Sequence, residues 1–115
     1  MRVPILAQES FLIASIQEEL SDEALQTLRD DLAVRVSKRR ATGIIIDVSA
    51  VDILDSFASR MLRDIAYAAK LQGARAIVVG IQPEVAYTMV MLGLRLSEVE
   101  TMLDLEEALT VLRHD

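Results

Sequence analysis

Ile44-Ile45-Ile46-Asp47-Val48-Ser49-Ala50-Val51-Asp52-Ile53-Leu54-Asp55-Ser56-Phe57-Ala58-Ser59 is the stretch of sequence that decides the fold. Its apolar start, residues 44–48, predicts a strand that is buried on both faces of a sheet. Asp52 and Asp55 then mark an acidic turn, and Ser56 opens a segment with helical periodicity that runs to Leu71. A buried strand, an acidic turn and a helix that begins at a serine form one unit of an α/β fold.

The rest of the chain continues this alternation of short apolar runs and helical segments. Further strands are expected at residues 3–6, 11–16 and 76–79 and near 97–101, and further helices at residues 21–40, 83–93 and from 104 onward. Pro4 removes one backbone donor, so the first strand should lie at a sheet edge. In the third helix, Met91 and Leu92 are expected to face the core with their apolar neighbours. The sequence therefore predicts an α/β fold with a mixed β-sheet of about five strands and about four α-helices.

The composition sets the class of protein. The 115 residues fall within the size of one domain, and a hydrophobic content of 52% is enough for a packed core. No apolar stretch approaches the ~20 residues that cross a bilayer, so a membrane association is not expected. The absence of cysteine excludes disulfides and thiolate catalysis and favours a cytoplasmic location. We therefore expect residues 1–115 to form a single cytoplasmic domain.

The charge of the chain bears on its partners. A formal net charge of −6 opposes binding to a phosphate backbone. With two tyrosines, two phenylalanines and no tryptophan, the chain also lacks an aromatic platform on which bases could stack. Nucleic acid is therefore not an expected partner.

Residues that commonly carry catalysis are scarce. His114, the only histidine, stands next to the carboxyl terminus, where a solvated role at a helix end is expected. The four glycines are scattered one per turn, so their spacing does not match that of a nucleotide-binding loop. Classical enzyme constellations are therefore mostly absent from the sequence, which narrows the field of functions, and no cofactor is expected.

Asp47, Asp52 and Asp55 gather around the end of the buried strand and could suggest a magnesium site for phosphoryl transfer. A response-regulator receiver domain has a comparable size and alternation of elements. Such a domain would need an acidic pair after its first strand and a lysine after its last, and this chain has Gln8-Glu9 and Ser-Glu-Val-Glu at 97–100 in those places. Turn and cap chemistry is the simpler account of the three aspartates, so no metal is expected.

Asp55 and Ser56 have two interpretations. Carboxyl and hydroxyl side chains at helix starts usually cap backbone N–H groups that have no partner within the helix. The alternative is that Ser56 offers its hydroxyl for a function. Ser59 lies one turn later and is either an ordinary exposed helix serine or a second site of modification.

The order of elements, together with residues 46–56, resembles the STAS domain, the fold of bacterial anti-sigma factor antagonists. Four segments are similar to the RsbS-type scaffold proteins of the stressosome within this superfamily: Ser15-Ile16-Gln17-Glu18-Glu19-Leu20, Asp55-Ser56-Phe57, Gly80-Ile81-Gln82-Pro83 and Glu100-Thr101-Met102-Leu103-Asp104-Leu105-Glu106. The resemblance covers nearly the whole chain.

This resemblance implies a non-catalytic, phospho-regulated scaffold. Its members bind a switch serine/threonine kinase of the RsbT type and release it when the serine that opens the second helix, here Ser56, is phosphorylated. The resemblance also implies homo-oligomers, a large hetero-assembly with an RsbR-like co-scaffold that contains a STAS domain, and a metal-dependent serine/threonine phosphatase that resets the serine. The expected partner-binding residues are Asp52, Asp55, Ser56, Phe57 and Ser59.

Two other functions stay open. The chain could be a stand-alone anti-sigma factor antagonist that binds an anti-sigma kinase directly, or a STAS module that binds a nucleotide or another small ligand. Simpler antagonists usually carry Asp-Ser-Ser-Gly where this chain has Asp55-Ser56-Phe57-Ala58, and the bulky Phe57 favours the stressosome branch.

Overall fold

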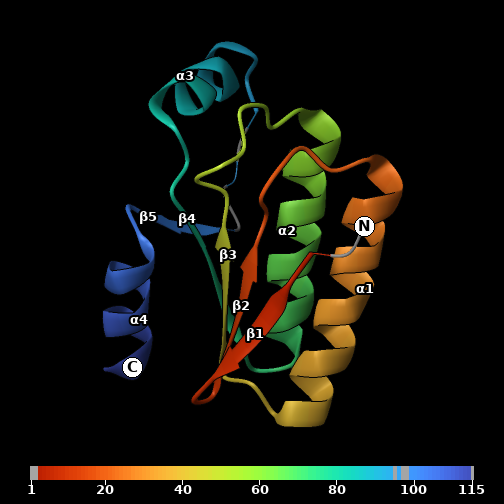
Figure 1. The fold of residues 1–115 in the computed structure, drawn as a ribbon, viewed down its shortest axis with the longest axis vertical. Coiled ribbons are helices and arrows are strands. Elements are labelled where there is room, and N and C mark those ends of the chain that lie inside the picture. The colour runs from red at the N-terminus through yellow and green to blue at the C-terminus, as the bar shows by residue number, and fades with distance from the viewer. Residues whose placement is uncertain (1–2, 95, 97–98, 115) are drawn as a thin grey trace.

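The computed structural model describes residues 3–94, 96 and 99–114, which form five strands and four helices. The elements in chain order are β1 (Ile5–Gln8), β2 (Phe11–Ser15), α1 (Asp22–Arg39), β3 (Gly43–Asp47), α2 (Ser56–Leu71), β4 (Arg75–Val79), α3 (Pro83–Met91), β5 (Glu100–Met102) and α4 (Leu105–Arg113). Figure 1 shows the strands between the α1–α2 pair and α4. The predicted α/β fold with a mixed sheet is confirmed.

The five strands form one sheet in the order β1-β2-β3-β4-β5. β1 and β2 are an antiparallel hairpin, and all the other neighbouring strands are parallel. β1 lies at the sheet edge, as Pro4 just before it predicts. Because parallel strands end at the same edge of a sheet, the turns that follow β2, β3 and β4 meet at one end of the molecule.

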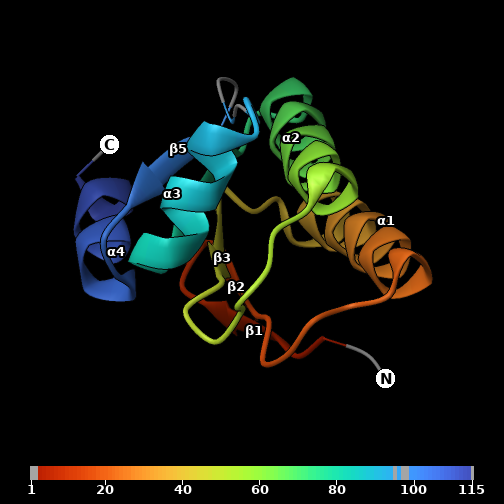
Figure 2. The same ribbon diagram turned by 90° about the horizontal axis from the view of Figure 1, so that it is seen from above.

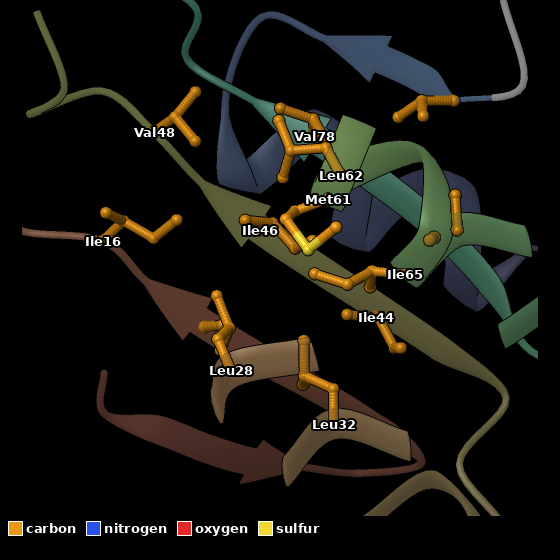
Figure 3. Close-up of a cluster of buried hydrophobic side chains, with 14 of the residues drawn as sticks. Ile16, Leu28, Leu32, Ile44, Ile46, Val48, Met61, Leu62, Ile65 and Val78 are labelled. Atoms are coloured by element: carbon orange, nitrogen blue, oxygen red, sulfur yellow. The ribbon is translucent and has the colours of Figure 1, made fainter. Parts of the chain in front are cut away.

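Alternate residues of the central strands face two separate cores. On β3, Ile44 and Ile46 pack beneath α1 and α2, whereas Ile45 packs on the opposite face with Leu109 and Leu112 of α4. Figure 2 shows α1 and α2 along one face of the sheet and α4 along the other. Figure 3 shows the larger core. Burial of β3 on both faces explains its nearly continuous apolar sequence.

α3 has a different position from the other helices. It lies at the carboxyl-terminal end of the parallel strands rather than along a face of the sheet (Figures 1 and 2). Val85 and Met89 are its buried residues. Met91 and Leu92 are 67% and 66% exposed, so the prediction that they face the core is wrong. A helix at the end of a sheet has a smaller surface to cover than one along its face.

Several predicted boundaries shift. β1 begins two residues later than expected, because the hairpin closes through the two-residue turn at Glu9 and Ser10. α1 ends at Arg39, with Arg40 in the left-handed conformation, so Gly43 is the first residue of β3 instead of the helix breaker. The last strand begins at Glu100; Ser97 and Glu98, which the prediction included, lie outside the described residues.

The length and apolar character of the helices bear on whether the chain could cross a membrane. Within residues 3–94, 96 and 99–114, no helix combines the length and the apolar character that a bilayer-spanning segment requires.

Candidate functional site

The amino-terminal end of α2 is the centre of the candidate site. Asp55 is the N-cap, and its Oδ1 accepts a hydrogen bond from the backbone N–H of Ala58 at 2.8 Å. The Asp55 carbonyl accepts a second bond, from the N–H of Ser59 at 2.9 Å. The capping interpretation is therefore confirmed for Asp55. Ser56 is the first residue inside the helix, and its side chain is exposed to solvent.

The loop that carries Ser56 is held at its start by Asp47. The Oδ1 atom of this residue accepts hydrogen bonds from the backbone N–H of Ser49 at 2.9 Å and from the Ser49 hydroxyl at 2.7 Å. Within the loop, Val51 and Leu54 are buried in the larger core. The carboxylate of Asp47 thus forms a turn, as predicted, and the apolar side chains fix the path of the chain from β3 to α2.

The turn after β4 supports the same loop from the side. The side-chain N–H of Gln82 donates to the carbonyl oxygen of Ser49 at 2.9 Å. Gly80, with a φ of +80°, passes so close that a Cβ at this position would lie 2.8 Å from the Cβ of Ser49. The sequence predicts a turn at Gly80, but it does not predict the contact that either residue makes with the Ser49 loop. An isolated glycine after a buried strand is a signal for a close backbone approach.

The predicted site residues separate into two groups. Asp52, Asp55 and Ser56 are exposed at the carboxyl-terminal end of the sheet, and Phe57 is half-buried and packs against the core. Ser59 is only 2% exposed, and its hydroxyl has no hydrogen-bond partner. The expectation of an exposed Ser59 is wrong, because the first turn of α2 directs this residue inward. A phosphate or a partner could not reach its hydroxyl without a rearrangement of the helix start.

A pocket of about 50 Å³ lies beside Ser56, between the β2–α1 loop and the β3–α2 loop. Its apolar wall includes Val51, Ile53 and Leu54, and its acidic residues are Glu18, Glu19 and Asp55. No group of three or more histidine, aspartate or glutamate side chains in the described part of the chain is arranged to hold a metal ion. Glu18, Glu19 and Asp55 contribute negative charge beside Ser56.

A larger cavity is at the other end of the sheet. It has a volume of about 660 Å³ and lies beside the amino-terminal end of β4, where Lys70, Arg75, Val99 and Glu100 contribute to its lining. Arg75 and Glu100 form an ion pair within it. The cavity and Ser56 lie at opposite ends of α2, so the cavity is not part of the candidate site.

Comparison with known proteins gives a consistent result. The STAS domain family model matches residues 2–108. The RsbT co-antagonist protein RsbRA of Bacillus subtilis is 28% identical over 101 residues, which are 88% of this chain and 37% of that protein. A solved variant of RsbS from Moorella thermoacetica is 32% identical, with a TM-score of 0.83, and the match covers 97% of this chain and 95% of that one. A chain in a structure of the stressosome, described as a signal integration and transduction hub, is 29% identical with a TM-score of 0.77 and 96% of each chain covered.

Proposed function

The chain belongs to the STAS domain family, and on this premise we propose that it is a phospho-regulated scaffold subunit of a stressosome-type assembly. In this role it binds a switch serine/threonine kinase of the RsbT type and releases it when Ser56 is phosphorylated. The similarity to RsbS over nearly the whole length of both chains supports the scaffold role. The chain itself carries out no reaction and acts in the cytoplasm in a stress or environmental signalling pathway.

The position of Ser56 is the observation that carries the proposal. Its side chain is exposed, while the capping of α2 is done by Asp55. The loop before it is fixed by the Asp47–Ser49 turn and by buried Val51 and Leu54. A kinase therefore meets a hydroxyl at a defined position on a rigid surface, and modification of this hydroxyl leaves the helix cap in place.

Phosphorylation of Ser56 would act on the surface more than on the fold. It adds a charge of about −1.5 to −2 beside Asp55 and near Asp52, in a chain that already carries −6. The start of α2 offsets part of this repulsion, because free N–H groups and the helix dipole favour an anion by about 0.3–1 kcal/mol. The fold then survives modification, whereas a partner that contacts Asp52, Asp55, Ser56 and Phe57 meets new charge and bulk.

The expected partners follow from the same proposal. RsbRA is named as an RsbT co-antagonist, and its similarity to this chain supports an RsbR-like co-scaffold in a large hetero-assembly that also contains copies of this chain. A metal-dependent serine/threonine phosphatase would return Ser56 to its free form. The chain spans about a third of the length of RsbRA, so no function of the other parts of RsbRA is proposed for this chain.

A capture experiment tests the proposal. Immobilised wild-type protein and the Ser56→Asp and Ser56→Ala variants are incubated with a purified RsbT-type kinase, and the retained kinase is measured before and after addition of Mg-ATP. Wild type should retain the kinase and release it with Mg-ATP, Ser56→Ala should retain it throughout, and Ser56→Asp should retain several-fold less. A Ser56→Asp protein that retains the kinase as well as wild type would refute the switch.

Two alternative functions make different predictions. A stand-alone anti-sigma factor antagonist would form a stable one-to-one complex with an anti-sigma kinase and no larger assembly. A ligand-binding module would use the 660 Å³ cavity beside Lys70 and Arg75, the one observation that favours it. Calorimetric titration with nucleotides, repeated on Lys70→Ala, tests this second alternative.

A further inference from the structure

Gln82, at the start of α3, uses its side chain to hold a different part of the chain. It occupies the N-cap position of α3, but its side chain makes no capping hydrogen bond to that helix. Instead, its Nε2 atom donates to the carbonyl oxygen of Ser49 at 2.9 Å, across 33 positions of the sequence. Glutamine is not among the preferred N-cap residues, so the start of α3 does not explain this side chain. Its bonded partner is the loop between β3 and α2.

Ser49 has a protein partner for each of its polar groups. Its backbone N–H and its hydroxyl donate to Oδ1 of Asp47 at 2.9 and 2.7 Å, and its carbonyl oxygen accepts from Gln82. Ser49 is an exposed residue, so burial alone does not require these three bonds. Their effect is to fix the direction in which the chain leaves β3 and enters the loop that leads to α2.

The opposite side of the same loop borders a pocket. β2 and β4 flank β3 on opposite sides, and the 50 Å³ pocket lined by Val51, Ile53 and Leu54 lies on the β2 side, away from Gln82. This volume exceeds the ~15 Å³ that one water molecule needs, so the loop has room to shift toward it. Buried Val51 and Leu54 hold the loop to the core, but apolar contacts are non-directional. The bond from Gln82 gives the loop the direction that these contacts lack.

We propose that Gln82 is a positioning residue for kinase binding. Through its bond to Ser49 it holds two exposed loop residues, Asp52 and Ile53, in one arrangement beside the start of α2. The inference rests on the proposed function, because it requires a kinase that binds next to Ser56. This serine itself lies on α2, which is packed in the larger core. Loss of the Gln82 bond therefore loosens the surface around the serine and leaves the serine in place, so that binding is weakened more than phosphoryl transfer.

Steady-state phosphorylation with Mg-ATP and a purified RsbT-type kinase tests the proposal. Gln82→Met has nearly the same shape but no N–H group, so it should raise the KM for this chain several-fold while kcat changes by less than about twofold. Gln82→Lys keeps a donor of similar reach and should return the KM to within about twofold of wild type. Gln72→Met, at an exposed glutamine at the other end of α2, is the matched control and should behave like wild type.

Hydrogen exchange measures the loop without the kinase. In Gln82→Met the backbone amide of Val51, which donates to the Val48 carbonyl at 3.0 Å, should exchange several-fold faster than in wild type. The amide of Ser59, which is bonded within the first turn of α2, should exchange at the wild-type rate. The proposal is overturned if the Val51 amide exchanges equally in both proteins, or if Gln82→Met has the wild-type KM. Failure of the proposed function is distinguished by wild type itself, which would then gain no phosphate; in that case both proposals fail.

Discussion

A Cβ built on Gly80 would lie 2.8 Å from the Cβ of Ser49 and 3.2 Å from the Ser49 backbone nitrogen and Cα. The turn after β4 and the loop after β3 are thus in direct contact at the carboxyl-terminal end of the sheet. The hydrogen bond from Gln82 to the Ser49 carbonyl lies in the same contact. This packing joins the base of α3 to the loop that ends at Ser56.

Gly80→Ala should destabilise the fold by at least about 1 kcal/mol more than Gly73→Ala, as measured by urea unfolding. The two glycines have nearly equal φ values, +80° and +82°, so both variants pay a similar cost of roughly 1–2 kcal/mol for the left-handed conformation. A Cβ at Gly73 meets no atom within 4 Å, whereas one at Gly80 meets Ser49. Equal destabilisation by the two variants would show that the contact with Ser49 is unimportant.

Asp55→Ala should lower the free energy of unfolding by about 1 kcal/mol, because the N–H of Ala58 loses its cap. Asp55→Asn should stay near wild type, since an asparagine oxygen accepts the same bond. Asp52→Ala, at an exposed position in the same loop, should change stability by less than about 0.5 kcal/mol. Thermal and urea unfolding of the three variants measure these differences, and a loss in Asp55→Asn equal to that in Asp55→Ala would contradict the capping role.

Ser59→Ala should raise the free energy of unfolding by about 1 kcal/mol. The substitution removes a buried hydroxyl that has no partner and adds a better helix former. Ser37→Ala is the control on α1, where an exposed serine contributes only the difference in helix propensity. If Ser37→Ala stabilises the protein as much as Ser59→Ala does, the burial of the Ser59 hydroxyl does not lower the free energy of unfolding.

The carboxyl group of Glu9 should titrate below its ordinary pKa of 4.5. The side-chain hydrogen bond from Arg113, opposed by desolvation and aided by the charge of the guanidinium, lowers the pKa of Glu9 in the folded protein. The stability from this pair is therefore fully present above the ordinary pKa and is lost as pH falls through the lowered value. Carboxyl NMR titration should show the Glu9 pKa rising toward its ordinary value in Arg113→Ala. An unchanged pKa would rule out the pairing in solution.

The parts of the fold that the sequence predicts best are those fixed by local pattern. α2 begins at Ser56 and ends at Leu71 as predicted, because its cap, its periodicity and the glycine after it all agree. The first strand shifts because alternation alone does not define where a hairpin turns. The exposure of Met91 and Leu92 was not predictable, since an apolar helix at the end of a sheet has the same sequence pattern as one packed on its face.

In the candidate site, too, some features follow from the local sequence and others depend on how distant parts of the chain pack together. Asp55 as a cap and Asp47 in a turn follow from residue type and spacing. The burial of Ser59 depends on how α2 rotates against the rest of the core, and the support from Gln82 joins residues that are 33 positions apart. Neither relationship leaves a signal in the local sequence.

Mapping of the phosphorylated residue is the sharpest test of the proposed switch at Ser56. Wild type, Ser56→Ala and the control Ser59→Ala are incubated with Mg-ATP and a purified RsbT-type kinase and analysed by intact mass and by fragmentation of the tryptic peptide 41–60, which contains both serines. One phosphate is expected, located on Ser56, that is absent from Ser56→Ala and retained in Ser59→Ala. A chain that gains no phosphate, or one that is still phosphorylated in Ser56→Ala, would contradict the proposed switch.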